Sequence, residues 1–316
     1  MYNEEIKTGF IKQYTKSINT AEVCRQTFDT MQSYEEQWGA DLCTRTADEL
    51  RPAIETMVGF RVKSKYMRLI ILKDYVKWCI ACGIPNACSG MLEIDGFGLG
   101  KIRSMTVYGP EHLQKCLDEI FDSEQEETTD CIYRCYFWLA YSGMREEDIM
   151  KVSVFDVDLS NLVVRHNGNE YIIYREAIRA FRNASTLHEF VYKHPNYPKP
   201  ILRNRVEGTQ LIRGIRAIPS QFTIRSEISR RISKKMKDGE TSIKLSYYRV
   251  WISGLFYRMY INEKNGDPVS FRDAALSFMD GKEYKLDSGR NTIEAKQRQI
   301  MNDYLQDYER WKAAYH

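Results

Sequence analysis

The hydrophobic residues at positions 1–85 repeat with the spacing of α-helices. Ile6, Phe10 and Tyr14, for example, lie four residues apart and form one stripe on a helix over residues 4–18. Three further helices are predicted in the same way: residues 21–38 with Thr20 as N-cap, a helix that Thr46 and Glu49 open as a capping box, and a long helix from Ser64 to Gly83. Together they predict a compact helical domain over residues 1–85.

The pattern changes over residues 86–105, where glycine is frequent. The string GFGLG resembles half of a phosphate-binding loop, but no dinucleotide-binding or P-loop motif follows it. We therefore expect residues 86–105 to be a glycine-rich linker between two domains.

The rest of the chain combines helices with a β-hairpin. A helix is predicted from Pro110, and the string CIYRCYFWLAY is apolar on almost every face, which is typical of a central buried helix. This helix should end at Ser142 and Gly143. Two β-rich segments flank Asn167 and Gly168, the strongest short signal for a hairpin. The remaining helices are predicted at residues 222–260 and 291–312.

Composition agrees with two domains and adds no cofactor. The chain has 316 residues, of which 43% are hydrophobic and 28% are charged, an ordinary globular balance. No apolar run is long enough to span a membrane, and the charged N-terminus does not resemble a secretory signal, so we expect a cytoplasmic protein. Cys79 and Cys82 have metal-ligand spacing but lack a second pair, so the eight cysteines are expected to be reduced and mostly buried, with no metal site.

The distribution of charge is more informative than the net charge of +3. Residues 199–237 carry eleven basic and two acidic residues, whereas residues 118–130 are strongly acidic. A solvated helix face needs fewer cations than that, so the basic segment indicates a surface that faces phosphate.

The order of these features resembles the catalytic domain of the tyrosine recombinases, the phage integrase family. A buried helix ends in Ser-Gly, and the string SGMREED follows, where the family has a motif like T-G-L-R-x-x-E; Arg145 then matches the first catalytic arginine. The string LSYYRVWISG resembles the family's H-x-x-R box, with Arg249 as the second arginine. The resemblance implies a mainly α fold with a small β-hairpin or sheet. It also implies two domains: a helical, SAM-like core-binding domain at residues 1–85, and a catalytic-like domain at residues 106–316.

The resemblance also implies chemistry that this chain lacks. The family cleaves DNA through a 3′-phosphotyrosine, with two arginines on the phosphate, a hairpin lysine as general acid, and histidines or a tryptophan that assist. Asn167 stands at the place of the lysine, Ser246 at that of the first histidine, and Met279 where a later histidine or tryptophan is expected. Serine and asparagine cannot replace groups that transfer protons near neutral pH. We therefore expect no catalytic residues, only two phosphate-binding arginines.

Three alternatives stay open at this point. Arg145 and Arg249 could be held in ion pairs, for example with the acidic residues at 146–148. Lys151 or His166 could supply the missing group through a shifted register. If the chain is an active recombinase, its nucleophile is expected to be Tyr304 or Tyr308, with Tyr284 as a further candidate, and it would form a covalent adduct with DNA.

The chain is also similar to the MrpR-type repressors of phage lytic genes, which resemble tyrosine recombinases in both domains. The strings MYNEEIKTGFIKQY and LIRGIRAIP, and the helix that contains Trp78 and Cys79, carry this resemblance. It implies a nucleoid-associated, sequence-specific repressor that holds lytic genes off in a lysogen. The expected partner is double-stranded DNA at operator sites, and self-association is left open.

We expect the two domains to close on duplex DNA mainly through phosphate contacts, which makes binding depend steeply on salt. The helix that begins near Phe222 is the candidate for the major groove, so Arg225→Ala should cost about 1–3 kcal/mol at one operator position. A rival interpretation is a protein-interaction scaffold that uses the acidic face at residues 118–130. The candidate DNA-binding residues are Arg145, Arg249, Arg225, Arg230, Lys234, Lys63, Lys65 and Arg68.

Overall fold

A computed structural model describes the chain except for residues 58–61, 95–98, 122–128, 193–198, 200 and 281–291. The described residues form two compact units. Unit 1 comprises residues 1–102 and 271–314 together with His316, and unit 2 comprises residues 103–270 together with Tyr315. The predicted fold class is confirmed, because the units are mainly helical with two small antiparallel sheets. None of the described helices is long and apolar enough to cross a membrane.

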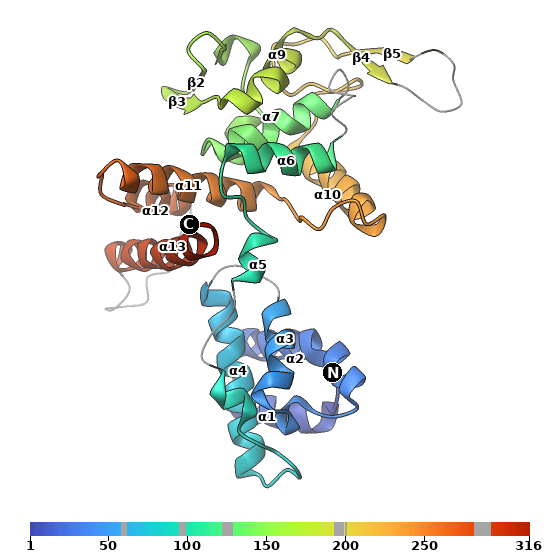
Figure 1. Cartoon of the computed structure of the whole chain (residues 1–316), viewed down its shortest axis with the longest axis vertical. Helices are drawn as coiled ribbons and strands as arrows, with labels where there is room; N and C mark the ends of the chain where they lie inside the picture. The colour runs from blue at the N-terminus through green and yellow to red at the C-terminus, as the bar shows by residue number, and fades with distance from the viewer. Residues whose placement is uncertain (58–61, 95–98, 122–128, 193–198, 200, 281–291) are drawn as a thin grey trace. The chain divides into compact units, whose positions relative to one another are not determined.

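The N-terminal part of unit 1 is a bundle of helices, as the hydrophobic pattern predicted (Figure 1). Thr46 and Glu49 form the predicted capping box at the start of α3. The prediction for α2 was wrong by one turn: the helix starts at Ile18 with Ser17 as N-cap, so Thr20 lies inside it. The elements are α1 (Glu4–Tyr14), α2 (Ile18–Trp38), η1 (Leu42–Thr44), α3 (Ala47–Thr56), α4 (Val62–Ala81) and η2 (Gly90–Glu93).

An aromatic cluster joins three of these helices. The rings of Phe10, Phe28 and Tyr75 come from α1, α2 and α4, and their centroids lie 5.0–6.1 Å apart. Met91 and Ile94 are buried in the same core. Residues 91–94 of the range predicted as a linker therefore contribute to the N-terminal core.

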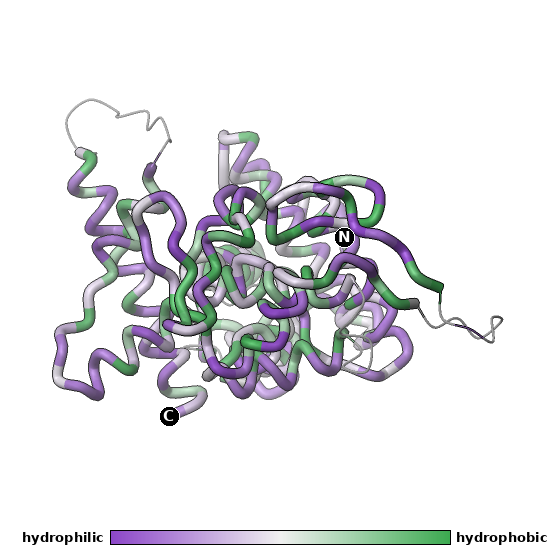
Figure 2. Tube along the Cα trace, turned by 90° about the horizontal axis from the view of Figure 1, so that it is seen from above, coloured by the Kyte–Doolittle hydropathy of each residue, from purple (hydrophilic) through white to green (hydrophobic). Residues whose placement is uncertain are grey.

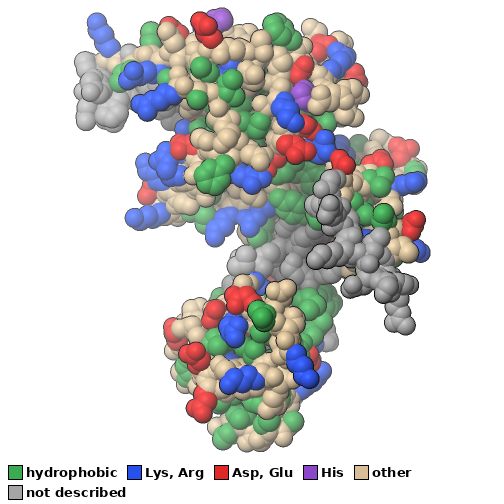
Figure 3. Space-filling view, turned by 180° about the vertical axis from the view of Figure 1, so that it is seen from behind, with side chains coloured by type: hydrophobic (Ala, Val, Ile, Leu, Met, Phe, Trp, Pro, Cys, Tyr) green, Lys and Arg blue, Asp and Glu red, His purple; other side chains and the backbone are tan. Residues whose placement is uncertain are grey.

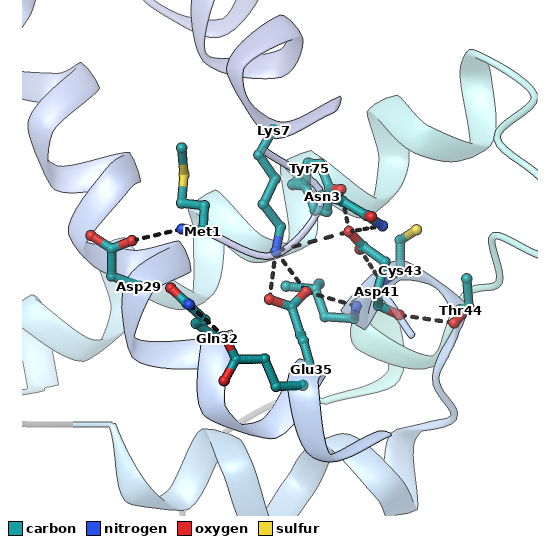
Figure 4. A network of polar contacts seen from close by, with 12 residues as sticks. Met1, Asn3, Lys7, Asp29, Gln32, Glu35, Asp41, Cys43, Thr44 and Tyr75 are labelled. Carbon is teal, nitrogen blue, oxygen red and sulfur yellow. Dashed lines mark hydrogen bonds and ion pairs between the residues drawn. The ribbon is translucent and has the colours of Figure 1, made fainter. Parts of the chain in front are cut away.

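A buried polar network lies beside this cluster (Figure 4). The Lys7 ammonium donates to both carboxylate oxygens of Glu35 at 2.5 and 2.6 Å and lies 3.9 Å from Asp41, while the Tyr75 hydroxyl donates to Asp41 at 3.0 Å. The side chains of Lys7 and Glu35 are fully buried. Because buried charges are tolerated only when paired, this network fixes α1 against α2 and η1.

Unit 1 also contains α12 (Arg272–Met279) and α13 (Ile293–Tyr315, of which Tyr315 counts with unit 2). Phe271, the N-cap of α12, packs against Tyr304 and Tyr308 of α13, with ring centroids 5.9 and 5.7 Å apart. The helix predicted at residues 291–312 is thus present.

Unit 2 is built around one helix that is buried on every side. All twelve residues of α7 (Asp130–Tyr141) are buried, as its uniformly apolar sequence predicted. Hydrophobic and hydrophilic residues are mixed along the other helices (Figure 2), which is typical of helices that bury one face. The other helical elements of unit 2 are α6 (Pro110–Ile120), α8 (Glu146–Ile149), η4 (Val154–Asp156), η5 (Arg175–Ala177), α9 (Ile178–Thr186), α10 (Gln221–Lys237) and α11 (Tyr247–Lys264).

The predicted hairpin is present and gains a third strand. Asn167 and Gly168 form its two-residue turn, with φ angles of 50° and 76°, and His166 pairs with Asn169 across it. The sheet order is β1-β2-β3, all antiparallel, from β1 (Val157–Asp158), β2 (Val163–His166) and β3 (Asn169–Ile172). A second pair, β4 (Glu189–Tyr192) with β5 (Ile201–Asn204), was not predicted, because no short turn motif marks it.

Candidate nucleic-acid interface

The candidate site in unit 2 starts at the turn that ends α7. Gly143 has a φ of 100°, a left-handed conformation that favours glycine and lets the chain reverse into α8. Arg145 is the N-cap of α8, and its Nε donates to Asp148 at 3.0 Å while Glu147 lies 3.6 Å away. The Arg145 side chain is 45% exposed, so these carboxylates compete with any external phosphate for a guanidinium that solvent can reach.

The first turn of α11 packs against the same turn. The Tyr247 hydroxyl donates to the carbonyl oxygen of Met144 at 3.0 Å, and the indole nitrogen of Trp251 donates to that of Gly143 at 3.2 Å. Gly254 permits this approach, because a Cβ there would lie 1.8 Å from the carbonyl oxygen of Tyr141. The SGMR turn and the LSYYR segment are therefore neighbours, although Met144 and Tyr247 lie 103 residues apart in the chain.

Ser246 has a structural role at this point. It is the N-cap of α11, and its hydroxyl accepts a hydrogen bond from the backbone N–H of Arg249 at 3.4 Å. Serine is among the best N-cap residues because its short side chain reaches the free N–H groups of the first turn. The sequence comparison with a histidine box did not reveal this cap, although Ser at the start of a helix is its usual signal.

Arg249 itself is half-buried. Its Nη1 donates to the backbone carbonyl of Lys244 at 2.5 Å, and burial lowers the pKa of its guanidinium. Within the part of the chain that the structure describes, no carboxylate forms an ion pair with Arg249. Of the two arginines singled out from the sequence, Arg145 is thus paired with carboxylates and Arg249 is not.

Arg225 is held by a carboxylate that the sequence gave no reason to connect with it. Its guanidinium donates twice to Glu146, which also accepts a hydrogen bond from the hydroxyl of Tyr136. The Glu146 side chain is 7% exposed, whereas that of Arg225 is 57% exposed. Arg225 therefore neutralises a buried charge between α8 and α10 while its outer edge remains open to solvent.

A cavity of about 510 Å³ lies beside these residues. Its wall combines aromatic and aliphatic side chains with two cations and three serines, and α7, α10 and the start of α11 supply them. The lining residues are Tyr136, Phe137, Arg225, Ile228, Ser229, Ile232, Ser233, Met236, Lys244, Leu245, Ser246, Tyr247 and Tyr248.

Helix α10 carries six of the eleven basic residues of the segment 199–237. Ile224, Ile228 and Ile232 are its buried side. Lys and Arg side chains gather over the part of unit 2 where α10 lies (Figure 3). Arg230 is 68% exposed and pairs only with Glu227 on its own helix, at 2.7 Å. Lys234 has no ion-pair partner among the described residues, and the same holds for Lys237.

Not all of the basic segment at 199–237 is available to a partner. Arg205 is 7% exposed and donates to the backbone carbonyls of Ala184, Leu187 and Leu211. Arg231 turns inward to Asp130 and lies 4.8 Å from the ring centroid of Tyr133. Such arginines stabilise the unit itself.

The hairpin places Asn167 at its exposed tip, where the positive φ suits asparagine. The imidazole ring of His166 is held by Asp156, whose carboxylate oxygen lies 2.8 Å from Nδ1. Lys151 lies 3.7 Å from Asp148. Both residues of the shifted-register alternative are thus engaged by carboxylates of unit 2.

The remaining candidates lie in unit 1. Met279 is half-buried at the end of α12, and both Tyr304 and Tyr308 are fully buried. Arg68 donates to the hydroxyl of Thr30 at 3.4 Å. Lys63 and Lys65 belong to α4, but their side chains lie outside the described part of the structure, as does all of Tyr284.

Comparison with known proteins identifies the N-terminal bundle. Residues 1–81 match the family model described as "MrpR, N-terminal core-binding domain". No curated protein sequence matches the chain. Among solved structures, it is similar to one described as "Crystal structure of XerA recombinase", with 16% identity, 84% of this chain and 86% of that chain covered, and a TM-score of 0.37. The resemblance predicted from the sequence is therefore confirmed for residues 1–81, where the chain matches the model of the MrpR N-terminal core-binding domain.

Proposed function

We propose that the chain is a sequence-specific repressor that binds double-stranded DNA and maintains phage lysogeny in the cytoplasm of the bacterial host. The observation that carries this proposal is the exposed basic face of α10, in a chain whose first domain is an MrpR-type core-binding domain. Cations that no carboxylate neutralises attract phosphates, and counterion release then supplies affinity. A helix fixed by three buried isoleucines holds these cations in place.

The scaffold is proposed to bind DNA without cleaving it. At the place of the family's histidine, Ser246 caps a helix, and at the place of the lysine, Asn167 forms a turn. Neither side chain can transfer a proton near neutral pH. Each missing acid or base removes on the order of 10²–10⁴-fold in rate, so the losses together leave negligible cleavage.

The buried tyrosines support the same proposal. A nucleophilic hydroxyl must reach the scissile phosphate, but Tyr304 and Tyr308 are 0% exposed and pack against Phe271. Arg249, which no carboxylate neutralises in the described residues, remains suited to hold a phosphate without chemistry. For Arg145 to do the same, it would exchange Asp148 for the phosphate.

Capture of genomic DNA tests this proposal against its rivals. The purified protein is mixed with sheared DNA from its source genome, bound fragments are recovered, and half of the sample is treated with SDS before both halves are sequenced. A repressor enriches a few sites and releases them in SDS. Fragments that survive SDS, and are lost in Tyr304→Phe or Tyr308→Phe, would establish an active recombinase instead. If the protein retains no DNA even at low salt, the result would support the other rival, a protein-interaction scaffold.

A further inference from the structure

The second residue of α10 is an aromatic side chain that the fold does not use. Phe222 is 78% exposed, and its ring contacts no other aromatic ring among the described residues. The backbone beneath it is well fixed, because the Ser220 hydroxyl accepts from the N–H of Thr223 at 3.2 Å and Ile224 is buried. The ring is thus presented to solvent on a well-fixed first turn, where contact with an apolar group of a partner would be favourable.

The residues that share a face with Phe222 are small or cationic. Counted from Phe222, they lie four, seven, eight, eleven and fifteen residues further along α10, which places them on one face of the helix. All of them are exposed. The serines do not shield the ring, and the cations stand toward the C-terminal half of the helix. These residues are Ser226, Ser229, Arg230, Ser233 and Lys237.

The charge of this face selects the partner. On this face Lys237 lacks an ion-pair partner in the described residues and Arg230 pairs only within its helix, so the surface complements a polyanion. The major groove of B-DNA admits an α-helix, and residues in the first turns of such a helix reach the base edges. The C5-methyl group of thymine is the apolar feature of that groove, and a phenylalanine ring can pack against it.

We propose that Phe222 reads a thymine in the major groove by packing against its C5-methyl group. This inference rests on the proposed DNA-binding function and adds to it a residue that determines specificity. The flanking cations then contact phosphates and hold the helix in register, while the ring distinguishes thymine from cytosine at one position.

Removal of single methyl groups from the DNA tests this contact directly. The probe is a duplex that carries the most enriched site from the genomic capture, in which each thymine is replaced in turn by deoxyuridine. For the wild-type protein, one or two replacements should weaken binding by about fourfold, the effect of one buried methyl group. For Phe222→Ala, binding should be weaker throughout, and uracil at those positions should cause no further loss.

The matched control is Phe155→Ala. Phe155 is 82% exposed in unit 2 but lies beside Asp156 rather than on a basic face. This variant should keep the wild-type affinity and the wild-type sensitivity to uracil. Phe222→Leu, which keeps an apolar side chain, should retain part of that sensitivity.

The outcomes separate this inference from the function on which it rests. If the wild-type protein binds the site but no uracil replacement weakens it, Phe222 does not read thymine, although the repressor proposal stands. The same conclusion follows if Phe222→Ala remains sensitive at the same positions. If the wild-type protein does not bind DNA at all, the proposed function fails and the inference fails with it.

Discussion

The hydroxyl of Ser246 accepts a hydrogen bond from the backbone N–H of Arg249, so the residue at the histidine's place caps the helix that carries the second arginine. Because the two residues are linked in this way, the position serves the fold of α11 rather than proton transfer. We therefore expect Ser246→Ala to lower the free energy of unfolding by about 1 kcal/mol. Ser246→Asp, which can also cap, should be close to wild type.

Urea denaturation followed by circular dichroism measures both variants. Equal stability of Ser246→Ala and the wild type would show that the cap contributes nothing. A gain of strand cleavage in Ser246→His would show that the site needs only its histidine, which contradicts the loss of several groups.

Arg225 is expected to matter for stability as well as for DNA. Its removal leaves the buried carboxylate of Glu146 with the Tyr136 hydroxyl and without its cation. We expect Arg225→Ala to lower the free energy of unfolding by about 1–3 kcal/mol, whereas Arg230→Ala, at an exposed pair, should change it by less than about 1 kcal/mol. Thermal unfolding of the two variants side by side checks this. Equal shifts in the two would contradict the role of Glu146.

The cations of α10 that lack partners should set the salt dependence of DNA binding. We expect the double variant Lys234→Ala/Lys237→Ala to bind every duplex more weakly and to lower the slope of log K against log salt by about 2. Fluorescence anisotropy at several salt concentrations measures the slope. Lys264→Ala, an exposed lysine at the end of α11, is the control and should leave the slope unchanged.

Glu227 should weaken DNA binding, because it neutralises part of the same face. Its hydrogen bonds with Arg230, and to a lesser extent Arg231, hold the pKa of its carboxyl below the usual value, so it is charged at neutral pH. We expect Glu227→Gln to release Arg230 and to strengthen DNA binding up to about fivefold. Weaker or unchanged binding in a titration at low salt would count against contact between this face and DNA.

The buried carboxylate of unit 1 should make stability depend on pH. Burial raises the pKa of Glu35, although Lys7 opposes this shift. A carboxyl with a higher pKa in the folded state binds more protons when folded, so stability falls as pH rises from the ordinary carboxyl value, about 4.3, through the raised one. We expect the free energy of unfolding to fall more steeply over this window in the wild type than in Glu35→Gln.

Denaturation at a series of pH values between about 4 and 7 gives this comparison. Parallel curves for the two proteins would show that Glu35 does not titrate in the window. Lys7→Met should be less stable than the wild type by about 3–5 kcal/mol at neutral pH, because it leaves Glu35 buried without its partner.

Local elements of the fold could be predicted from the sequence, since they depend on residues close together in the chain. The Thr46–Glu49 capping box, the fully buried α7 and the turn at Asn167 and Gly168 were all predicted and are present. The N-cap of α2 was misplaced because Ser17 and Thr20 are both residue types that cap helices well. The strands β4 and β5 escaped prediction because no two-residue hairpin motif links them.

The candidate site, too, could be predicted only in part. The neighbouring positions of the SGMR turn and the LSYYR segment were implied by a family resemblance, and contacts of Tyr247 and Trp251 hold them together. The predicted roles of Arg145, Arg249, Arg225 and the other candidate residues in DNA binding stay predictions. The structure shows which of these arginines and lysines already form ion pairs with carboxylates of the chain.

The sequence by itself therefore determined the helices of the N-terminal bundle, the buried helix α7, the hairpin turn and the concentration of basic residues at 199–237, because periodicity, capping and composition are local properties. The helical prediction for residues 222–260 was wrong at residues 238–246, which lie between α10 and α11. Only the tertiary structure decided how that charge is used. Arg205 and Arg231 bind groups inside unit 2. Arg225 pairs with a glutamate 79 residues away, and Lys234 stays exposed. The physical reason is that an ion pair depends on a distance of a few ångströms, and packing of distant segments sets that distance.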